Sequence, residues 1–266
     1  YNTHKETFKG KPRWQRKKTF GFDWKKNLPI PKELPEMEWP INYDKSMDLL
    51  RCLAAIDESL GTVLATLEEI GELDNTVIIY SSDNGYFMGE HTFLDKRLAY
   101  ESSMRVPMLI RYPKLIKKNT EIKEQCLNID LAPTILNLAG IKIPSYMQGE
   151  SMVNLLKGRK ENNWRKSFLF EYYLDTYWPY AGPNQIAVRT ENYKFVDSFL
   201  KNDIDELYNL ITDPGEMDNL INNSNYDVIE QDLRLQATLL KKQYKYNPNR
   251  DWWLKQVMKS KGKNKH

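Results

Sequence analysis

The sequence predicts an α/β fold, in which helices flank a mixed, mostly parallel sheet and a smaller C-terminal antiparallel sheet with a helix follows. A long amphipathic helix is indicated at 44–70, because apolar side chains recur there at helical spacing until Gly71. The β-branched run at 75–80 (NTVIIY) is typical of a strand buried on both faces, as in sheets that helices cover. Beyond Gly149 the pattern changes to short strands, which favours an antiparallel unit.

The remaining elements follow in chain order. The larger unit is predicted to contain two further strands and a helix, at 106–112, 125–129 and 131–139. The smaller unit is predicted to contain three strands and a final helix, at 167–173, 185–190, 193–199 and about 226–246. Between the last two of these strands, Glu191-Asn192 is typical of a hairpin turn.

These patterns divide the chain into segments: an irregular lead-in at 1–40, the downstream part of an α/β domain at 41–145, a smaller α+β subdomain at 146–250 and a basic tail at 251–266. Because the chain begins with Tyr1 and its lead-in lacks hydrophobic periodicity, we expect it to be the downstream portion of a longer protein. The larger domain is therefore expected to be incomplete.

Composition and charge exclude several classes of protein. Hydrophobic residues make up 41% of the chain, but no apolar stretch approaches the roughly 20 residues that a membrane span needs. The net charge of +3 comes with basic runs near both ends and without a groove-reading motif, so we expect no nucleic-acid partner. Cys52 and Cys126 lie in apolar surroundings without metal-ligand spacing, and we expect both to be buried small hydrophobes.

A group of polar residues follows the predicted strand at 75–80. Asp83 and Asn84 supply a carboxylate and an amide oxygen, the hard donors that Ca²⁺ or Mg²⁺ prefers, and Gly85 permits a sharp turn. In open α/β sheets, ligands gather at the carboxyl ends of the strands. Lys96 adds a compact cation that can balance an oxyanion. Taken alone, Asp-Asn-Gly is more typical of an ordinary turn, so a wider pattern is needed to favour a metal site.

The wider pattern is a resemblance to a known family. The stretch TVIIYSSDNGYFMGEHTFLDKRLAYESSMRVPMLIRYP, residues 76–113, resembles the downstream half of the sulfatases, which belong to the alkaline-phosphatase-like superfamily. Further blocks match in the same order: NIDLAPTILNLAGIKIPSYMQGESMVNLL, AVRTENYKFV and ELYNLITDPGEMDNL. Together they span about residues 42–220 and are most similar to carbohydrate sulfatases of the N-acetylglucosamine-6-sulfatase and mucin-desulfating type.

The resemblance implies roles for individual residues. Asp83 and Asn84 match the family's second pair of calcium ligands, and Lys96 matches the lysine that contacts the sulfate group. His91 matches the histidine of the Gly-Glu-His motif, either as a catalytic, substrate-facing residue or as a structural hydrogen-bonding one. Thr92 replaces the glycine that is common at the next position, a change that concerns the local turn rather than the metal pair.

Other residues are predicted to support the site or the substrate. Glu101 and Arg105 are expected to form an ion pair that organises their loop. The aromatic segment at 174–185 contains Tyr177 and Trp178, which are expected to stack on sugar faces; packing beneath their own loop is the alternative.

The family chemistry also requires groups that this sequence lacks. The resemblance implies a formylglycine nucleophile made from Cys or Ser in a C/S-x-P-x-R motif, a first aspartate pair on the metal, and an upstream Lys and His, none of which occurs here. Because calcium affinity follows the number and charge of the ligands, Asp83 and Asn84 alone are expected to bind calcium weakly. The chain as given is expected to be inactive.

The resemblance thus implies the downstream portion of a calcium-dependent sulfatase that acts on a sulfated carbohydrate and is periplasmic or secreted. Two alternatives stay open. A phosphodiesterase or phosphonate-ester hydrolase of the same superfamily would use the same metal pair and lysine. A catalytically dead, glycan-binding fragment would keep the fold without the reaction, which the absent nucleophile motif favours.

Overall fold

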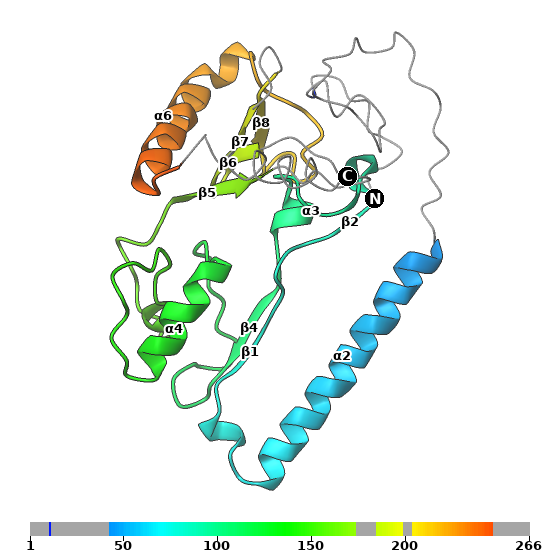
Figure 1. The fold of residues 1–266 in the computed structure, drawn as a ribbon, viewed down its shortest axis with the longest axis vertical. Coiled ribbons are helices and arrows are strands. Elements are labelled where there is room, and N and C mark those ends of the chain that lie inside the picture. The colour runs from blue at the N-terminus through cyan, green and yellow to red at the C-terminus, as the bar shows by residue number, and fades with distance from the viewer. Residues whose placement is uncertain (1–10, 12–42, 174–184, 199–203, 247–266) are drawn as a thin grey trace, which may run out of the picture. The chain divides into compact units, whose positions relative to one another are not determined.

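The computed structural model describes Lys11 and residues 43–173, 185–198 and 204–246 (Figure 1). The chain forms two compact units that divide after Lys166, with Lys11 belonging to the second. The predicted basic tail at 251–266 lies outside the described residues, as does the predicted lead-in at 1–40 apart from Lys11.

The first unit begins with a long helix, α2 (Tyr43–Glu69), as the helical spacing predicts. Gly71 follows at φ 72°, a left-handed conformation that glycine adopts without steric cost. Many apolar side chains of α2 are exposed, among them Leu49, Leu50, Leu53, Ile56 and Val63. An amphipathic helix normally buries such a stripe, so the described part of this unit leaves α2 without an apolar partner. Neither α2 nor any other helix in the described ranges is long and apolar enough to cross a membrane.

Two short strands follow α2 and pair with each other. β1 (Ile78–Ser81) runs antiparallel to β4 (Met108–Arg111), which confirms both predicted strands. β1 starts later than predicted, because Leu73–Asn75 forms the 3-10 helix η2. The prediction that β1 is buried on both faces is wrong for the described residues, since the whole strand is only half-buried. β4 is its single partner among them, and a two-stranded sheet covers little surface.

The predicted third strand at 125–129 is wrong. Its end forms the 3-10 helix η4 (Asn128–Asp130), which leads directly into α4 (Leu131–Leu138), the predicted helix. The cause is Asp130, whose Oδ2 accepts a hydrogen bond from the backbone N–H of Leu127 at 2.7 Å and turns the chain before the helix.

The core of the first unit forms around the short helix α5 (Val153–Leu156). Buried side chains from this helix and its flanks pack against β4 and the segment that follows it; they are Met152, Leu155, Leu156 and Trp164. The sequence pattern assigns this segment to the smaller subdomain, whereas its buried side chains pack on the first unit.

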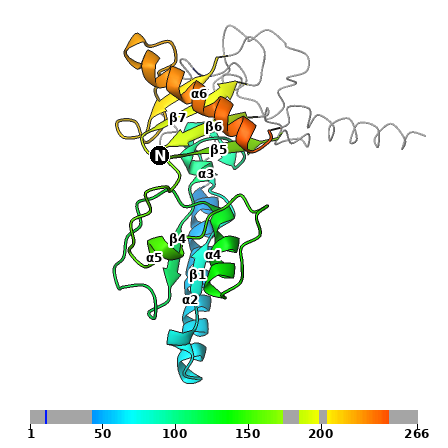
Figure 2. The same ribbon diagram turned by 90° about the vertical axis from the view of Figure 1, so that its left-hand side faces the viewer.

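The second unit is a four-stranded antiparallel sheet in the order β5-β6-β7-β8. Its elements are β5 (Ser167–Tyr172), β6 (Gln185–Thr190), β7 (Tyr193–Ser198), β8 (Glu206–Asn209) and the helix α6 (Asp227–Gln243). The predicted strands, hairpin turn and final helix are confirmed, and β8 is a further strand that was not predicted from the sequence. Figures 1 and 2 show α6 lying across one face of the sheet.

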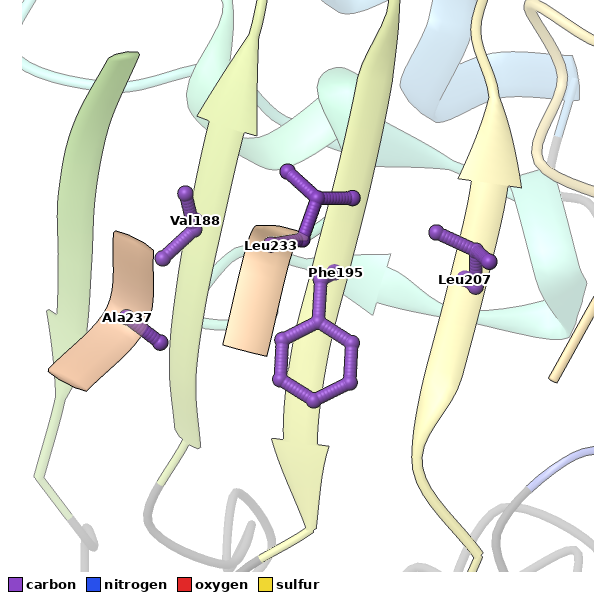
Figure 3. Packing of buried hydrophobic residues seen from close by; sticks show 5 residues of the cluster. All are labelled: Val188, Phe195, Leu207, Leu233 and Ala237. Atoms are coloured by element: carbon purple, nitrogen blue, oxygen red, sulfur yellow. The ribbon is translucent and has the colours of Figure 1, made fainter. Parts of the chain in front are cut away.

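The core of this unit lies between α6 and the sheet (Figure 3). Leu233 and Ala237, one helical turn apart on α6, are buried against Val188, Phe195 and Leu207 from three neighbouring strands. Both α6 and the sheet face that it covers belong to this unit, so the unit buries the apolar side chains between them without another partner.

The second unit also buries charged groups. Lys194 forms an ion pair with Glu216 at 2.6 Å, and both side chains are almost wholly buried. The Nζ of Lys11 donates to the hydroxyl of Tyr208 and to the backbone oxygen of Glu216, each at 2.6 Å. Because buried charges are tolerated when they are paired, this cluster holds β7, β8 and the loop after β8 together.

The cysteines differ from the prediction and from each other. Cys52 on α2 is exposed, so the expectation that it is buried is wrong; its helix lacks an apolar partner among the described residues. Cys126 is half-buried, and burial, with a smaller contribution from the charge of Asp130, raises the pKa of its thiol to about 11.

We expect the two thiols to react at very different rates with an aromatic disulfide reagent at pH 8. A pKa of about 11 leaves roughly one thousandth of Cys126 as thiolate at that pH, whereas Cys52 is exposed. Absorbance of the released thiol should show one fast phase, which the Cys52→Ser variant lacks. Raising the pH by one unit should speed the slow phase about tenfold. Two fast phases at pH 8 would contradict the raised pKa of Cys126.

Leu233→Ala should lower the free energy of unfolding of the second unit by about 2–5 kcal/mol, because it leaves a cavity in a closed core. Leu235→Ala, at an exposed position of the same helix, should change it by less than about 0.5 kcal/mol. Denaturant titrations followed by far-UV circular dichroism measure both variants. Equal losses would show that the core in Figure 3 does not stabilise this unit.

Candidate functional site

The turn after β1 presents two oxygen atoms that no hydrogen bond engages among the described residues. Asp83 accepts hydrogen bonds at Oδ1, from the backbone N–H of Asn84 at 2.9 Å and from the hydroxyl of Ser82 at 3.3 Å. Asn84 donates from Nδ2 to the backbone oxygen of Gly85 at 2.7 Å. Oδ2 of Asp83 and Oδ1 of Asn84 therefore remain available, and hard oxygen donors on consecutive residues at a strand end fit Ca²⁺ or Mg²⁺.

This pair is not a complete metal site. Within the part of the chain that the structure describes, no group of three or more His, Cys, Asp or Glu side chains is placed to hold a metal ion. A calcium ion takes about 6–8 oxygen ligands, so most of its shell would have to come from elsewhere in the protein or from water.

The turn is supported from two sides. On one side, the backbone N–H of Gly85 donates to the backbone oxygen of Ser103 at 2.8 Å. The approach is so close that a Cβ on Gly85 would lie 2.2 Å from the backbone oxygen of Ser102, which explains the glycine. On the other side, Nδ2 of Asn128 donates to the backbone oxygen of Asp83 at 2.8 Å. Asp83 and Asn84 are thereby held by groups distant in the sequence.

A buried ion pair stands behind Asn128. Arg165 binds Asp130 through two parallel contacts, Nη1 to Oδ2 at 2.5 Å and Nη2 to Oδ1 at 2.6 Å. The same carboxylate accepts the backbone N–H groups of Leu127 and Glu150, at 2.7 and 2.8 Å. These four hydrogen bonds satisfy both oxygen atoms of the buried carboxylate. They therefore fix the backbone segment that carries Asn128.

An aromatic cluster supports the loop that carries His91. The loop is framed by β2 (Phe87–Met88) and β3 (Leu94–Asp95), which pair with each other. His91 is 2% exposed and stacks on the ring of Tyr100, with the centroids 4.1 Å apart. Its φ of 52° lies in the left-handed region, which residues other than glycine rarely occupy. Burial and stacking favour the structural role predicted for His91, while its substrate-facing role stays a prediction.

Lys96 follows β3 and is half-buried. Its ammonium group forms neither a hydrogen bond nor an ion pair with any described residue. The next residue, Arg97, has a φ of 99°, and its backbone N–H donates to Oγ of Ser103 at 2.9 Å. Ser103 lies in the short helix α3 (Glu101–Met104) and also binds Gly85, so the residues that follow Asn84 and Lys96 share one anchor.

Several other predicted residues have different outcomes. Tyr177 and Trp178 lie outside the described residues, so their predicted contact with sugar stays a prediction. The predicted ion pair between Glu101 and Arg105 is wrong: Arg105 is exposed, and the two residues are linked through the backbone, by Arg105 N–H to the oxygen of Glu101 at 2.8 Å.

Ser103 and Asn128 were not predicted from the sequence to belong to the site. Each acts through a hydrogen bond to the backbone of a residue in another segment, and such bonds leave no spacing pattern in the sequence. Both residues lie within the sequence blocks that resemble the sulfatases, and this was the one indication in the sequence that they belong to the site.

The chain matches two family models. One is described as "Sulfatase" and matches residues 3–141; the other is described as "N-sulphoglucosamine sulphohydrolase, C-terminal" and matches residues 89–243. A curated relative, the N-acetylglucosamine-6-O-sulfatase of Bacteroides thetaiotaomicron, is 39% identical over 204 residues, which cover 75% of this chain and 36% of that protein. This chain therefore spans little more than a third of the length of that relative.

Solved structures also resemble the chain. One, of a protein in complex with its substrate D-glucosamine-2-N,6-O-disulfate, aligns with a TM-score of 0.69 and 37% identity, over 74% of this chain and 40% of that chain. A phosphonate monoester hydrolase from Silicibacter pomeroyi aligns with a TM-score of 0.63 and 25% identity, over 71% of this chain and 39% of that chain. These similarities confirm the predicted fold class, an incomplete alkaline-phosphatase-like α/β domain followed by a smaller antiparallel unit.

Gly85→Ala should displace the turn, because the added Cβ would lie 2.2 Å from the backbone oxygen of Ser102. We expect the amide at position 85 to exchange its hydrogen at least about tenfold faster, as its bond to Ser103 weakens. Gly61→Ala in α2 is the matched control: its Cβ meets no atom within 4 Å and should stabilise the helix by about 0.5–1 kcal/mol. Amide exchange measured by nuclear magnetic resonance compares the variants, and unchanged protection at position 85 would contradict the close approach.

Proposed function

Because this chain belongs to the sulfatase family, we propose that it is the downstream part of a calcium-dependent enzyme that hydrolyses sulfate esters of carbohydrates. The observation that carries the proposal is the pair of available oxygen atoms on Asp83 and Asn84 at the end of β1. These residues would hold part of the shell of a calcium ion. A bound divalent cation supplies positive charge where the sulfuryl oxygens gain negative charge.

Lys96 is the second proposed component. A half-buried ammonium group without a partner among the described residues can bind an oxyanion without first breaking an ion pair. We assign it to contact the sulfate group. His91 we assign to the support of the same loop, since its ring is enclosed by aromatic neighbours.

The remaining catalytic groups would come from polypeptide outside this chain. The proposed nucleophile is a formylglycine, and no C/S-x-P-x-R motif from which it is made occurs in the sequence. The exposed apolar stripe of α2 and the half-buried strand β1 support a larger domain that covers them. We therefore propose that the chain as given does not turn over substrate.

The proposed substrate is a sulfated amino sugar in a glycan, with 6-O-sulfated N-acetylglucosamine as the first candidate. The relative at 39% identity carries that specificity in its name, and the most similar of the structures described above binds a 6-O-sulfated glucosamine. A periplasmic or secreted location, where calcium is abundant, suits this chemistry.

A phosphonate-ester hydrolase is the second candidate function. The observation that favours it is the structural similarity to a phosphonate monoester hydrolase at 25% identity. A metal pair and a lysine would serve phosphoryl transfer equally well. We rank this candidate second because the identity to a sulfatase is higher. A catalytically dead, glycan-binding fragment is the remaining alternative.

Calcium titrations test the proposed metal pair. We expect CaCl₂ to shift the amide resonances of residues 83–85 with a dissociation constant in the millimolar range, because few ligands are present. Asp83→Ala should abolish the shifts, whereas Asp57→Ala, which removes an exposed carboxylate on α2, should leave them unchanged. Equal shifts in all three proteins would overturn the assignment.

Assays on 4-nitrophenyl sulfate and on 6-O-sulfated N-acetylglucosamine test the proposed inactivity. We expect no release of nitrophenol or sulfate above the rate without protein, because the nucleophile is absent. Turnover that survives purification and disappears in Asp83→Ala would overturn the proposal for the chain as given. Turnover of a phosphonate monoester that is also lost in Asp83→Ala would favour the second candidate.

A further inference from the structure

We propose that Ser103 is a positioning residue that holds Lys96 at a fixed position relative to the Asp83-Asn84 turn. The proposal rests on the function assigned above to these groups, but its structural part stands on hydrogen bonds within the first unit. Ser103 is 5% exposed, and its backbone N–H donates to the oxygen of Tyr100 at 2.9 Å. Tyr100 is itself 2% exposed, so Ser103 is attached to a closely packed part of the unit.

The first link runs from Ser103 to the turn. The backbone oxygen of Ser103 accepts the N–H of Gly85 at 2.8 Å, directly after the two proposed calcium ligands. A Cβ on Gly85 would lie 2.2 Å from Ser102 and 2.9 Å from Arg105, measured to their backbone oxygens. The backbone of the turn is therefore pressed against the backbone of α3, and a shift of one moves the other.

The second link runs from Ser103 to the lysine. Oγ of Ser103 accepts the N–H of Arg97 at 2.9 Å, directly after Lys96. Arg97 has a φ of 99°, far outside the conformations that a residue with a side chain prefers. A strained backbone of this kind persists when surrounding contacts hold it, and the buried hydroxyl of Ser103 is one such contact. Its loss should let Arg97 relax and carry Lys96 away from its present position.

The two links use different atoms of one residue, so they can be separated by mutation. Ser103→Ala removes the hydroxyl and its bond to Arg97, but it keeps the backbone oxygen that binds Gly85. Ser102→Ala removes the hydroxyl at the preceding position of the same helix, for which no hydrogen bond is found among the described residues. The pair of variants therefore isolates the contact to Arg97.

Amide exchange without added ligand tests the positioning role directly. In Ser103→Ala we expect the Arg97 amide to exchange at least about tenfold faster, while the Gly85 amide keeps its protection to within about threefold. Ser102→Ala should match the unmodified chain at both positions. Protection of amides in α4, which lies in the same unit as Ser103, shows that this unit is folded in the variants. Unchanged protection of Arg97 in Ser103→Ala would overturn the proposal.

Ligand titrations test the functional part. In the unmodified chain, CaCl₂ should shift the amide resonances of residues 96 and 97 together with those of 83–85. In Ser103→Ala, the shifts at 83–85 should persist, those at 96 and 97 should fall at least about threefold, and the dissociation constant for inorganic sulfate should rise by a similar factor. Calcium shifts at residues 96 and 97 that are the same in both proteins would overturn the coupling.

The two experiments separate this proposal from the proposed function. If the unmodified chain binds neither calcium nor sulfate, the assignment of Asp83, Asn84 and Lys96 fails, whereas the exchange of the Arg97 amide still decides the positioning role of Ser103. A double variant, Ser103→Ala with Arg97→Gly, adds a check on the mechanism. Because glycine adopts a positive φ without strain, the calcium shift at residue 96 should partly return; no return would overturn the role of backbone strain.

Discussion

The first unit depends on the buried ion pair between Asp130 and Arg165, in which both oxygen atoms of the carboxylate are fully hydrogen-bonded. The carboxylate is wholly buried and binds Arg165 together with the backbone N–H groups of Leu127 and Glu150. The backbone oxygen of Asp130 also accepts the hydroxyl of Thr134. One side chain thereby joins the start of α4 to segments far along the chain. Removing one partner of a buried ion pair typically costs about 3–5 kcal/mol, because the other charge is left without compensation.

The buried ion pair of Asp130 also helps to position the candidate site. Asn128, two residues before Asp130, holds the backbone of Asp83 from one side, and Ser103 holds Gly85 from the other. A backbone held in this way limits where the available oxygen atoms of Asp83 and Asn84 can lie, which would lower the entropic cost of binding a ligand. Lys96 has the same property, since the backbone that follows it is attached to Ser103.

The two units differ in how completely they bury their apolar surface. The second unit closes its core between α6 and the sheet and also buries the Lys194–Glu216 ion pair. The first unit exposes the apolar stripe of α2, and its β1 is only half-buried. Since exposed apolar surface of this extent is unfavourable in water, the first unit depends on further polypeptide more than the second does. This contrast agrees with a chain that spans little more than a third of a relative's length.

The sequence by itself determined the elements whose hydrophobic pattern is long and regular. The helix α2, the strands β5, β6 and β7 and the helix α6 follow from local spacing, whereas the short strand β8 was not predicted. The blocks around Asp83 and Lys96 identified the family. Local pattern failed at 125–129, where a short apolar run suits a strand or a turn equally well. The turn is favoured over the strand by Asp130, which is held by its bond to Arg165, 35 residues away.

Only the tertiary structure decided which residues support the candidate site. Asn128 reaches Asp83 across 45 residues of sequence, and Ser103 joins two loops that have no common pattern. The exposure of Cys52 was equally invisible, because burial of an apolar helix face depends on whether a partner is present. Hydrophobic periodicity reflects the local helix or strand to which a residue belongs. Hydrogen bonds between distant segments form only when the chain has folded, so local spacing does not reveal them.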